Sequence, residues 1–235
     1  MGSTDETTTE ASIPPLRPGP SGLPRQQVSE IQRARVLAAA VEVVEELGYA
    51  GMTVAQVIGR AKVSRKTFYD LFADRQDCFM AVFEEATARI RALVEEACAD
   101  EKRWRESVRW RESVRSGLAR VLVFLEEEPA LARICLIEAQ GAGTKLLERR
   151  AQIFGELAEV IDRGRAVTSA VREPPKVTAE GLVGAVFAVL QTRLLESSDE
   201  PFTDLLGPLM SMIVLPYLGP RAAHGELTRP LEKSE

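Results

Sequence analysis

The sequence predicts an all-α protein, and three observations point to that fold class. Apolar residues recur at the spacing of one helix face through most of residues 28–219. No segment sustains the alternation of apolar and polar residues that a half-buried strand needs. The breaks between the periodic segments are rich in Pro and Gly, which end helices rather than continue them.

The first helix is predicted between a capping box at Ser29–Gln32 and a stop at Gly48. Charged residues occupy the face opposite its apolar stripe, as expected for a helix with one buried side. The stripe consists of Leu37, Val41, Val44 and Leu47.

Two short helices follow, and the spacing between them predicts a helix-turn-helix. Thr53 can cap the first of them, with Gln56 in the capping-box position. Ser64 can cap the second, and the segment Ala61-Lys62-Val63 has the length of the tight turn between them. The side chains expected to point inward are Val54, Val57, Ile58, Phe68, Leu71 and Phe72.

The second short helix is predicted to present a basic edge. Arginine and lysine donate hydrogen bonds to guanine O6 and N7, while threonine, tyrosine and backbone N–H groups bond phosphates. The alternative is a solvated charged loop, but two capped helices at this spacing favour the DNA-binding interpretation. The outward residues are Arg65, Lys66, Thr67 and Tyr69, and the four cations of the turn region, with no acid among them, are Arg60, Lys62, Arg65 and Lys66.

The rest of the chain is also predicted to be helical. A long amphipathic helix begins after Asp74, and another carries the stripe from Trp110 to Leu125 and ends at Glu126–Pro129. The loop Arg172–Pro175 separates later helices. These are expected over about residues 130–140, 145–165, 178–196 and 202–217, the last interrupted by Gly207-Pro208.

A tandem hexapeptide, Trp104–Arg109 followed by Trp110–Arg115, interrupts this pattern. Six residues do not complete a whole number of helical turns, so the two copies face different directions. Trp110 and Val114 continue the core stripe, so we expect Trp104 to lie at a rim or in a loop. The duplication is too short for a repeat architecture.

The composition excludes most catalytic and metal sites. His224 is the one histidine, and Cys78, Cys98 and Cys135 form no C-x-x-C pair, so a structural zinc site lacks ligands. A nucleophile–base pair would need His224, near the C-terminus. We therefore expect no enzyme activity, no metal and no cofactor, with the cysteines as reduced core thiols.

Membrane insertion and secretion are not expected either. The longest apolar runs, Leu182–Leu190 and Leu209–Leu218, are shorter than the roughly 18–20 residues of a spanning helix. The N-terminus is acidic and lacks the apolar segment of a signal peptide. The sequence therefore predicts a cytoplasmic protein with no membrane partner.

Four regions are expected: a disordered arm over 1–27, a helix-turn-helix domain over 28–75, a helical regulatory and dimerisation domain over 76–219, and a disordered tail over 220–235.

The formal net charge is −5, which speaks against a surface coated in nucleic acid. Residues 25–75, however, hold eight basic and six acidic side chains. The acidity lies mainly after residue 75, which leaves room for one basic contact patch.

Residues 31–79 strongly resemble the N-terminal DNA-binding domain of TetR-family transcriptional regulators. The shared pattern has a late Gly-Tyr in the first helix, a Thr-Val start, an Ala-x-Val-Ser turn and a Thr-Phe-Tyr-x-x-Phe recognition helix. One departure is Lys62, where the family usually has glycine; a side chain in left-handed backbone costs on the order of 1 kcal/mol. The matching segments are Gly48-Tyr49, Thr53-Val54, Ala61–Ser64, Thr67–Phe72 and Asp74-Arg75.

The resemblance implies roles for individual residues. Thr53, Tyr69 and Arg75 would hold the phosphate backbone, and Lys62 adds a cation near the DNA. Arg33 and Arg35 would touch a flanking phosphate or simply be solvated. The residues implied to face the major groove are Ser64, Arg65, Lys66 and Thr67.

The resemblance also implies a C-terminal ligand-binding and dimerisation domain of about six helices, whose last two helices pair with those of a second copy. Small residues would permit that close approach beside an apolar surface, which a monomer of this size does not require. The alternative is a helix central to one subunit's core. The candidate interface residues are Gly181, Gly184, Ala185, Phe187 and Ala188.

A ligand pocket is expected among the central helices, because polar groups embedded in apolar runs suit an apolar cavity with few polar anchors. The alternatives are that the aromatic residues are plain core and that Glu138 pairs with Arg133. The candidate wall residues are Trp110, Phe124, Glu138, Gln140, Phe154 and Gln191.

These observations together predict a homodimeric repressor that a small apolar or amphipathic ligand releases from a palindromic double-stranded operator. The alternative is a DNA-binding regulator without a small-molecule ligand, or an activator. An enzyme built on a helical bundle comes third, since no metal set or nucleophile–base pair is available.

Overall fold

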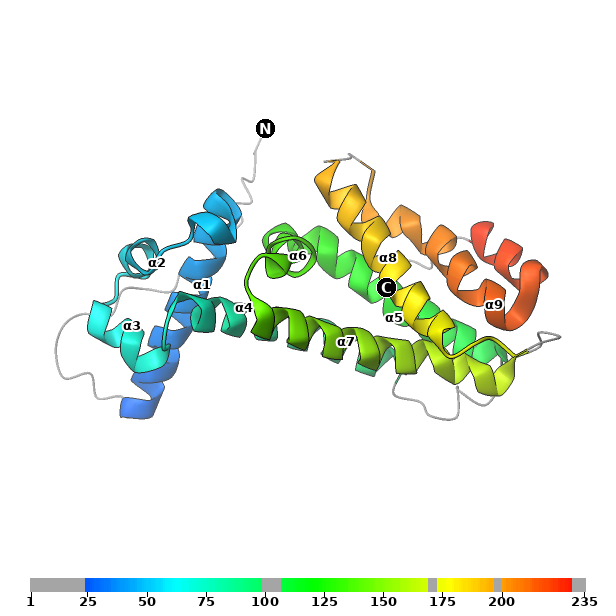
Figure 1. Ribbon diagram of the computed structural model, residues 1–235, viewed down its shortest axis with the longest axis horizontal. Coiled ribbons are helices and arrows are strands. Elements are labelled where there is room, and N and C mark those ends of the chain that lie inside the picture. The colour runs from blue at the N-terminus through cyan, green and yellow to red at the C-terminus, as the bar shows by residue number, and fades with distance from the viewer. Residues whose placement is uncertain (1–23, 99–106, 169–172, 197–199, 230–235) are drawn as a thin grey trace, which may run out of the picture.

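The computed structural model describes residues 24–98, 107–168, 173–196 and 200–229, and these are helical with no strand among them. The all-α prediction is therefore confirmed for this part of the chain. Figure 1 shows a three-helix unit at one end of an elongated molecule and a bundle of longer helices at the other. Helix α4 runs from the first unit into the bundle.

Helix α1 (Arg25–Gly51) begins earlier than the sequence pattern indicates. The residue before the helix is Pro24, and Ser29 and Gln32 lie inside the helix, so the capping box expected there is wrong. Arg25 and Gln26 are good helix formers and extend the helix upstream. The stop at Gly48 is confirmed, because its φ of 67° is left-handed and breaks the helical path before one final turn.

Helices α2 (Val54–Ala61) and α3 (Arg65–Leu71) pack on α1 and on each other. Their buried side chains include Val57 and Phe68, which are closed to solvent. The predicted helix-turn-helix is thus present, with a three-residue connection.

The bundle contains the remaining elements in chain order, and the boundaries predicted for them are correct to within a few residues except at α9. They are α4 (Arg75–Cys98), α5 (Ser107–Glu127), α6 (Pro129–Leu136), η2 (Glu138–Gln140), α7 (Thr144–Asp162), η3 (Arg163–Val167), α8 (Val177–Leu195), η4 (Phe202–Leu205) and α9 (Leu206–Leu227).

Helix α9 corrects two expectations. Gly207-Pro208 does not interrupt it but lies in its first turn, where proline's missing N–H would have no helical partner anyway. The break falls instead at Gly219, whose φ is 79°, before Pro220. Helix resumes as far as Leu227, so the tail predicted to be disordered is folded over residues 220–229.

The second hexapeptide copy explains why the C-terminal segment is folded. The buried Trp110 ring packs edge-on against Tyr217, with 5.2 Å between the ring centroids. On the same helix, Arg115 Nη1 donates to Glu226 Oε2 at 2.7 Å, and both side chains are buried. Arg229 pairs with Glu112 at 2.5 Å. The first copy, with Trp104, lies outside the described residues apart from its last residues.

The apolar core of the three-helix unit extends into the bundle. The cluster that contains Phe68 and Phe79 also contains Ile134, Ala139 and Leu146 from α6, η2 and α7. A second cluster fills the interior between α5, α8 and α9. The orientation of the helix-turn-helix is therefore fixed by apolar contacts with α6 and its neighbours.

Two helical segments, Val177–Leu195 and Phe202–Leu227, are long and apolar enough to cross a membrane by length and composition alone. The apolar runs identified in the sequence, Leu182–Leu190 and Leu209–Leu218, cover only part of these two segments. The core helices of a globular bundle pass the same test. Much of α9 is indeed packed into the second cluster.

The two described thiols make stability fall at alkaline pH. Burial raises the pKa of Cys78 and of Cys135 to about 12, from the 9.0 of an exposed thiol. The unfolded thiols ionise first, so the free energy of unfolding should fall by roughly 1.4 kcal/mol per pH unit per thiol between about pH 9 and about pH 12. Urea unfolding across this range should show a shallower decline in the double variant Cys78→Ala/Cys135→Ala. Equal slopes would contradict the assignment.

Candidate nucleic-acid interface

The start of α2 is fixed by the reciprocal capping box that the sequence predicts. Thr53 N donates to Gln56 Oε1 at 2.9 Å, and Gln56 N donates to Thr53 Oγ1 at 3.3 Å. The Thr53 hydroxyl also donates to Gln56 Oε1 at 2.6 Å. Thr53 is exposed, so its backbone and hydroxyl lie at the surface in a fixed conformation.

The turn between α2 and α3 holds Lys62 in the left-handed conformation, with φ 53° and ψ 45°. It is the one non-glycine residue with positive φ among those described. Arg35 supports this turn from α1, because its Nη2 donates to the Ala61 carbonyl at 2.6 Å. Arg35 therefore fixes the end of α2 rather than lying free in solvent.

Helix α3 begins at Ser64, whose Oγ accepts a hydrogen bond from Thr67 N at 3.0 Å. The Ser64 and Thr67 hydroxyls are 2.8 Å apart and share a second hydrogen bond. This cap fixes the first turn of α3. Thr67, which the sequence places on the outer face, is half-buried.

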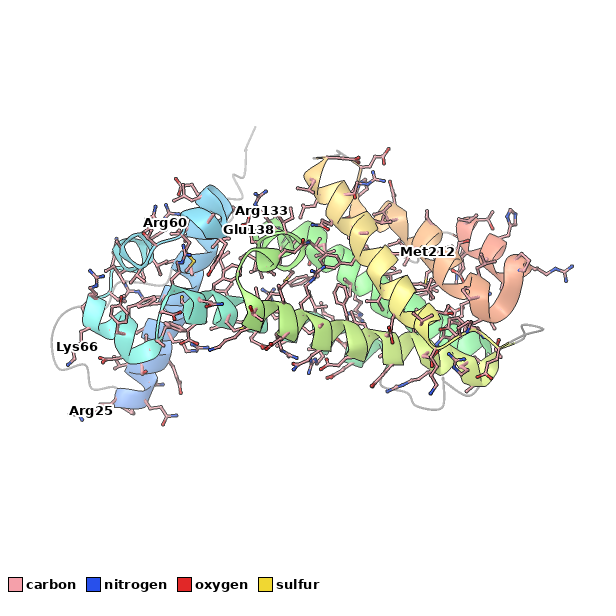
Figure 2. The ribbon with its side chains drawn as sticks, viewed as in Figure 1. Arg25, Arg60, Lys66, Arg133, Glu138 and Met212 are labelled. Carbon is pink, nitrogen blue, oxygen red and sulfur yellow. The ribbon has the colours of Figure 1, made fainter. Side chains whose placement is uncertain are left out.

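The exposed edge of this unit is cationic. Lys62, Arg65 and Lys66 are exposed, and none has an acidic partner within ion-pair distance in the part of the chain that the structure describes. Figure 2 shows Lys66 at the outer end of the molecule, far from the bundle. Tyr69 is 48% exposed, with the Arg65 guanidinium 5.9 Å from its ring centroid.

Arg60, the fourth cation of the cluster, is turned away from this edge. Its guanidinium contacts Glu46 at 2.5 Å and Glu42 at 3.7 Å on α1. The hydrogen bond to Glu46 raises the pKa of Arg60. Arg60 thus holds α2 against α1, and the exposed cations of the edge number three among the described residues.

Arg75 is half-buried and already has partners within the protein. Its Nη1 donates to the Met52 carbonyl at 2.8 Å, and its guanidinium lies 4.7 Å from the centre of the Tyr49 ring. The resemblance to TetR-family regulators implies a phosphate contact at this position, and that contact stays a prediction. The geometry shows a brace between the start of α4 and the corner that presents Thr53. Arg33 similarly lies over the Phe72 ring, at 5.0 Å.

Glu138 links the helix-turn-helix unit to the bundle. Its Oε2 accepts a hydrogen bond from Tyr49 N at 2.8 Å, and its Oε1 accepts one from Arg133 Nε at 3.1 Å. A Cβ on Gly48 would lie 3.3 Å from the same carboxylate. Figure 2 shows Arg133 and Glu138 together where α6 approaches the end of α1. The alternative that Glu138 pairs with Arg133 is therefore confirmed.

The other predicted pocket residues do not line one common cavity. Trp110 is packed into the second core, and Gln140 is exposed, with its amide donating to the Leu136 carbonyl at 3.3 Å. Phe154 is half-buried against Phe187, with 5.1 Å between ring centroids. Phe187 was expected in the dimer interface, yet this contact turns it toward α7. Gln191 is half-buried on α8.

A cavity of about 880 Å³ lies between α4, α5 and the junction of η4 with α9. Of the six predicted pocket residues, Phe124 alone lines it. Two arginines on its walls are paired: Arg89 contacts Glu128 at 2.6 Å, and Arg120 contacts Glu96 at 3.9 Å. No group of three or more potential metal ligands occurs among the described residues.

Sequence reasoning missed Arg150, a half-buried residue on α7. Its guanidinium lies 4.1 Å from the centre of the Phe187 ring and 4.8 Å from that of Phe154. The signal was present in the sequence, because Arg150 occupies an apolar register of α7, one turn before Phe154.

Comparison with known proteins agrees with this geometry. Residues 36–82 match the family described as bacterial regulatory proteins, tetR family. The chain is similar to the fatty acid degradation regulator FadR from Bacillus halodurans, with a TM-score of 0.67 at 18% identity over 77% of this chain and 94% of that one.

Two further solved structures share the fold. SmeT, the repressor of the Stenotrophomonas maltophilia multidrug efflux pump SmeDEF, has a TM-score of 0.67 at 18% identity, covering 85% of this chain and 97% of that one. The FadR regulator from Bacillus subtilis, solved in complex with stearoyl-CoA, has a TM-score of 0.64 at 17% identity, covering 78% and 98%. No curated protein matches the sequence.

Replacing Lys62 by glycine should separate backbone strain from DNA contact. Lys62→Gly relieves the left-handed strain, so the free energy of unfolding should rise by about 0.5–1 kcal/mol. The same change removes a cation, so the slope of log affinity against log salt for random-sequence duplex DNA should decrease by about one. Chemical denaturation and fluorescence anisotropy measure the two effects.

Lys62→Ala is the matched control, since it removes the cation and keeps the strain. Its slope of log affinity against log salt should decrease by the same amount, but its free energy of unfolding should not rise. If both variants keep the full salt slope, Lys62 makes no phosphate contact.

Proposed function

We propose that this chain, whose residues 36–82 match the tetR family of bacterial regulatory proteins, is a dimeric repressor released from a palindromic operator by a small apolar or amphipathic ligand. The observation that carries the DNA-binding part is the exposed, unpaired cationic edge at the start of α3, on a helix-turn-helix whose helices are both capped. Capped ends fix the backbone, so the edge is presented in one conformation. A repressor of this kind would act in the cytoplasm, where it meets its operator.

Base recognition is assigned to Arg65 and Lys66, because both are exposed on the first turn of α3 and neither has an acidic partner among the described residues. Thr53, Lys62 and Tyr69 surround them and would contact phosphates. Ser64 and Thr67 hold each other, so they would contribute mainly by fixing the helix start. Arg75 would act through the Met52–Thr53 corner that it braces.

Helix α8 supports the dimer. Val177, at 65%, and Leu195, at 60%, are exposed at its two ends. No atom lies within 4 Å of a Cβ built on Gly181 or Gly184, so packing within this chain does not require glycine there. A second copy that approaches closely would require it. These residues lie on one face of α8, here called the α8 stripe, which consists of Val177, Gly181, Gly184, Ala188, Thr192 and Leu195, with Ala185 beside it.

Helix α9 continues this apolar surface. It packs beside α8, and Leu215 on it is 48% exposed. Met212, labelled in Figure 2, lies beside α8 in that view and is half-buried. A two-fold pairing of these helices would bury the surface and place two recognition helices about one DNA turn, roughly 34 Å, apart.

The link at Glu138 supports ligand-dependent release. A ligand among α6, α7 and α8 that favours another position of α6 would pull on Tyr49 through the Glu138 carboxylate and on the shared core through Ile134. Either change reorients the α1–α3 unit relative to its partner, which weakens binding to an operator of fixed spacing. The stearoyl-CoA bound to the Bacillus subtilis neighbour supports an amphipathic ligand.

Selection of operator DNA from random duplexes tests the function directly. The wild-type protein should enrich a palindrome with half-sites about one turn apart. Arg65→Ala and Lys66→Ala should each cost about 1–3 kcal/mol on that operator and relax base preference.

Arg60→Ala provides the matched control, since it removes a neighbouring cation that is paired with α1. It should leave base preference unchanged. If Arg65→Ala weakens the operator and random DNA equally, Arg65 does not read bases.

A charge placed on the α8 stripe should break the dimer. Ala188→Glu buries an unpaired carboxylate at the proposed interface, a cost of several kcal/mol that shifts the chain to monomers. Sedimentation equilibrium should show the change in mass, and operator affinity should fall with it. Ala38→Glu, on the exposed face of α1, is the control and should leave the mass unchanged. A dimer that survives Ala188→Glu would place the interface elsewhere.

A further inference from the structure

Helix α7 carries an arginine in its core-facing stripe. Leu146 and Ile161 of this stripe are buried, and Ile153 and Leu157 pack against the two apolar clusters. Arg150 lies between them at the same helical spacing, one turn after Leu146. A position that packing assigns to an apolar side chain is thus occupied by a permanent cation.

The Arg150 guanidinium has two aromatic neighbours and no acid. It lies 4.1 Å from the centroid of the Phe187 ring and 4.8 Å from that of Phe154. Its Nε is buried without a hydrogen-bond partner, and no carboxylate pairs with it among the described residues. Arg149, the preceding residue, is bound to Glu84 at 2.7 Å and lies 3.7 Å from Glu156.

This arrangement leaves a charge without full compensation. Desolvation lowers the pKa of Arg150, which is the sign of a cation that has lost water without gaining an anion. Stacking on two rings replaces part of the stabilisation that water gave to the charge, since the ring faces are negative. A carboxylate would stabilise the charge more, because the planar guanidinium donates two parallel hydrogen bonds to it.

We propose that Arg150 binds the anionic headgroup of an amphipathic organic acid whose apolar part lies along Phe154 and Phe187 between α7 and α8. Gln191, one turn after Phe187 on the same face of α8, supplies a second polar group near the head. The proposal rests on the ligand-release function above and adds the chemical class of the ligand and its anchoring residue.

The position of Arg150 also connects the site to both outputs of the protein. One turn before it, Leu146 belongs to the core shared with the helix-turn-helix unit. Opposite it, Phe187 is on α8, the helix assigned to the dimer interface. An anion that draws α7 and α8 together at this point therefore acts on the DNA-binding unit and on the dimer at once.

The test uses the full-length protein and a panel of straight-chain carboxylates from hexanoate to dodecanoate, together with phenylalkanoates. Alcohols and amines of the same chain lengths are the matched probes without the anion. Thermal unfolding and calorimetric titration measure binding, since a ligand of the folded state raises the unfolding midpoint. Carboxylates should raise the midpoint, and the alcohols and amines should not.

The variants are Arg150→Met, Arg150→Lys and, as a control on the exposed face of α7, Lys145→Met. Arg150→Met should weaken carboxylate binding by about tenfold to a hundredfold, Arg150→Lys by less, and Lys145→Met not at all. Without ligand, Arg150→Met should raise the unfolding midpoint by a few degrees, because it removes a desolvated charge and keeps the packing volume.

Four outcomes would overturn the proposal: no carboxylate binds, the alcohols bind equally well, Arg150→Met binds as the wild type does, or Arg150→Met lowers the midpoint of the free protein. Operator binding separates this failure from that of the proposed function. Release by a compound of another class, unaffected by Arg150→Met, would preserve ligand release and refute the anion site. Binding of carboxylates at Arg150 without loss of operator affinity would preserve the site and refute ligand release.

Discussion

The helix-turn-helix unit and the helical bundle share one apolar core, and the orientation of the cationic edge depends on this sharing. Ile134, Ala139 and Leu146 pack with the residues that hold α1 to α3 together. The hydrogen bond from Tyr49 N to Glu138 lies beside this core. Apolar contacts alone favour no particular orientation, whereas a hydrogen bond is directional and so helps to fix the angle between the two units. Because close-packed interiors transmit displacement rather than absorb it, a shift of α6 must move the DNA-binding unit as well.

The pairing of charges distinguishes arginines that hold helices together from those that have no carboxylate partner. Arg60 and Arg149 each lie close to other basic residues in the sequence. In the structure, each pairs with a glutamate on a neighbouring helix. Arg65 is exposed and has no acidic partner among the described residues, and Arg150 is desolvated with the same lack. A cation that retains its hydration can meet DNA at the surface, whereas one that has lost hydration is stabilised most by an anion that replaces the lost water.

Local rules predicted much of the fold and the local geometry of the helix-turn-helix. The caps at Thr53 and Ser64, the left-handed Lys62 and the stop at Gly48 each depend on a few consecutive residues, and all four are present. The pocket could not be predicted in the same way, because α4, α5 and the junction of η4 with α9 form the cavity only when helices far apart in sequence pack together, and of the predicted residues Phe124 alone lines it. The C-terminal tail was misjudged for a related reason: Glu226 and Arg229 are polar, and their partners are more than a hundred residues away.

The sequence by itself determined the helical class, the helix-turn-helix and the type of residue on its outer edge, because periodicity and capping are properties of neighbouring residues. The tertiary structure alone decided which charges are compensated. It paired Arg60 with α1, bonded Arg75 to Met52, folded the tail onto the second hexapeptide and left Arg150 against two phenyl rings. A charge acquires its role from the groups that packing brings within a few ångströms of it, and that neighbourhood is assembled from parts of the chain far apart in sequence.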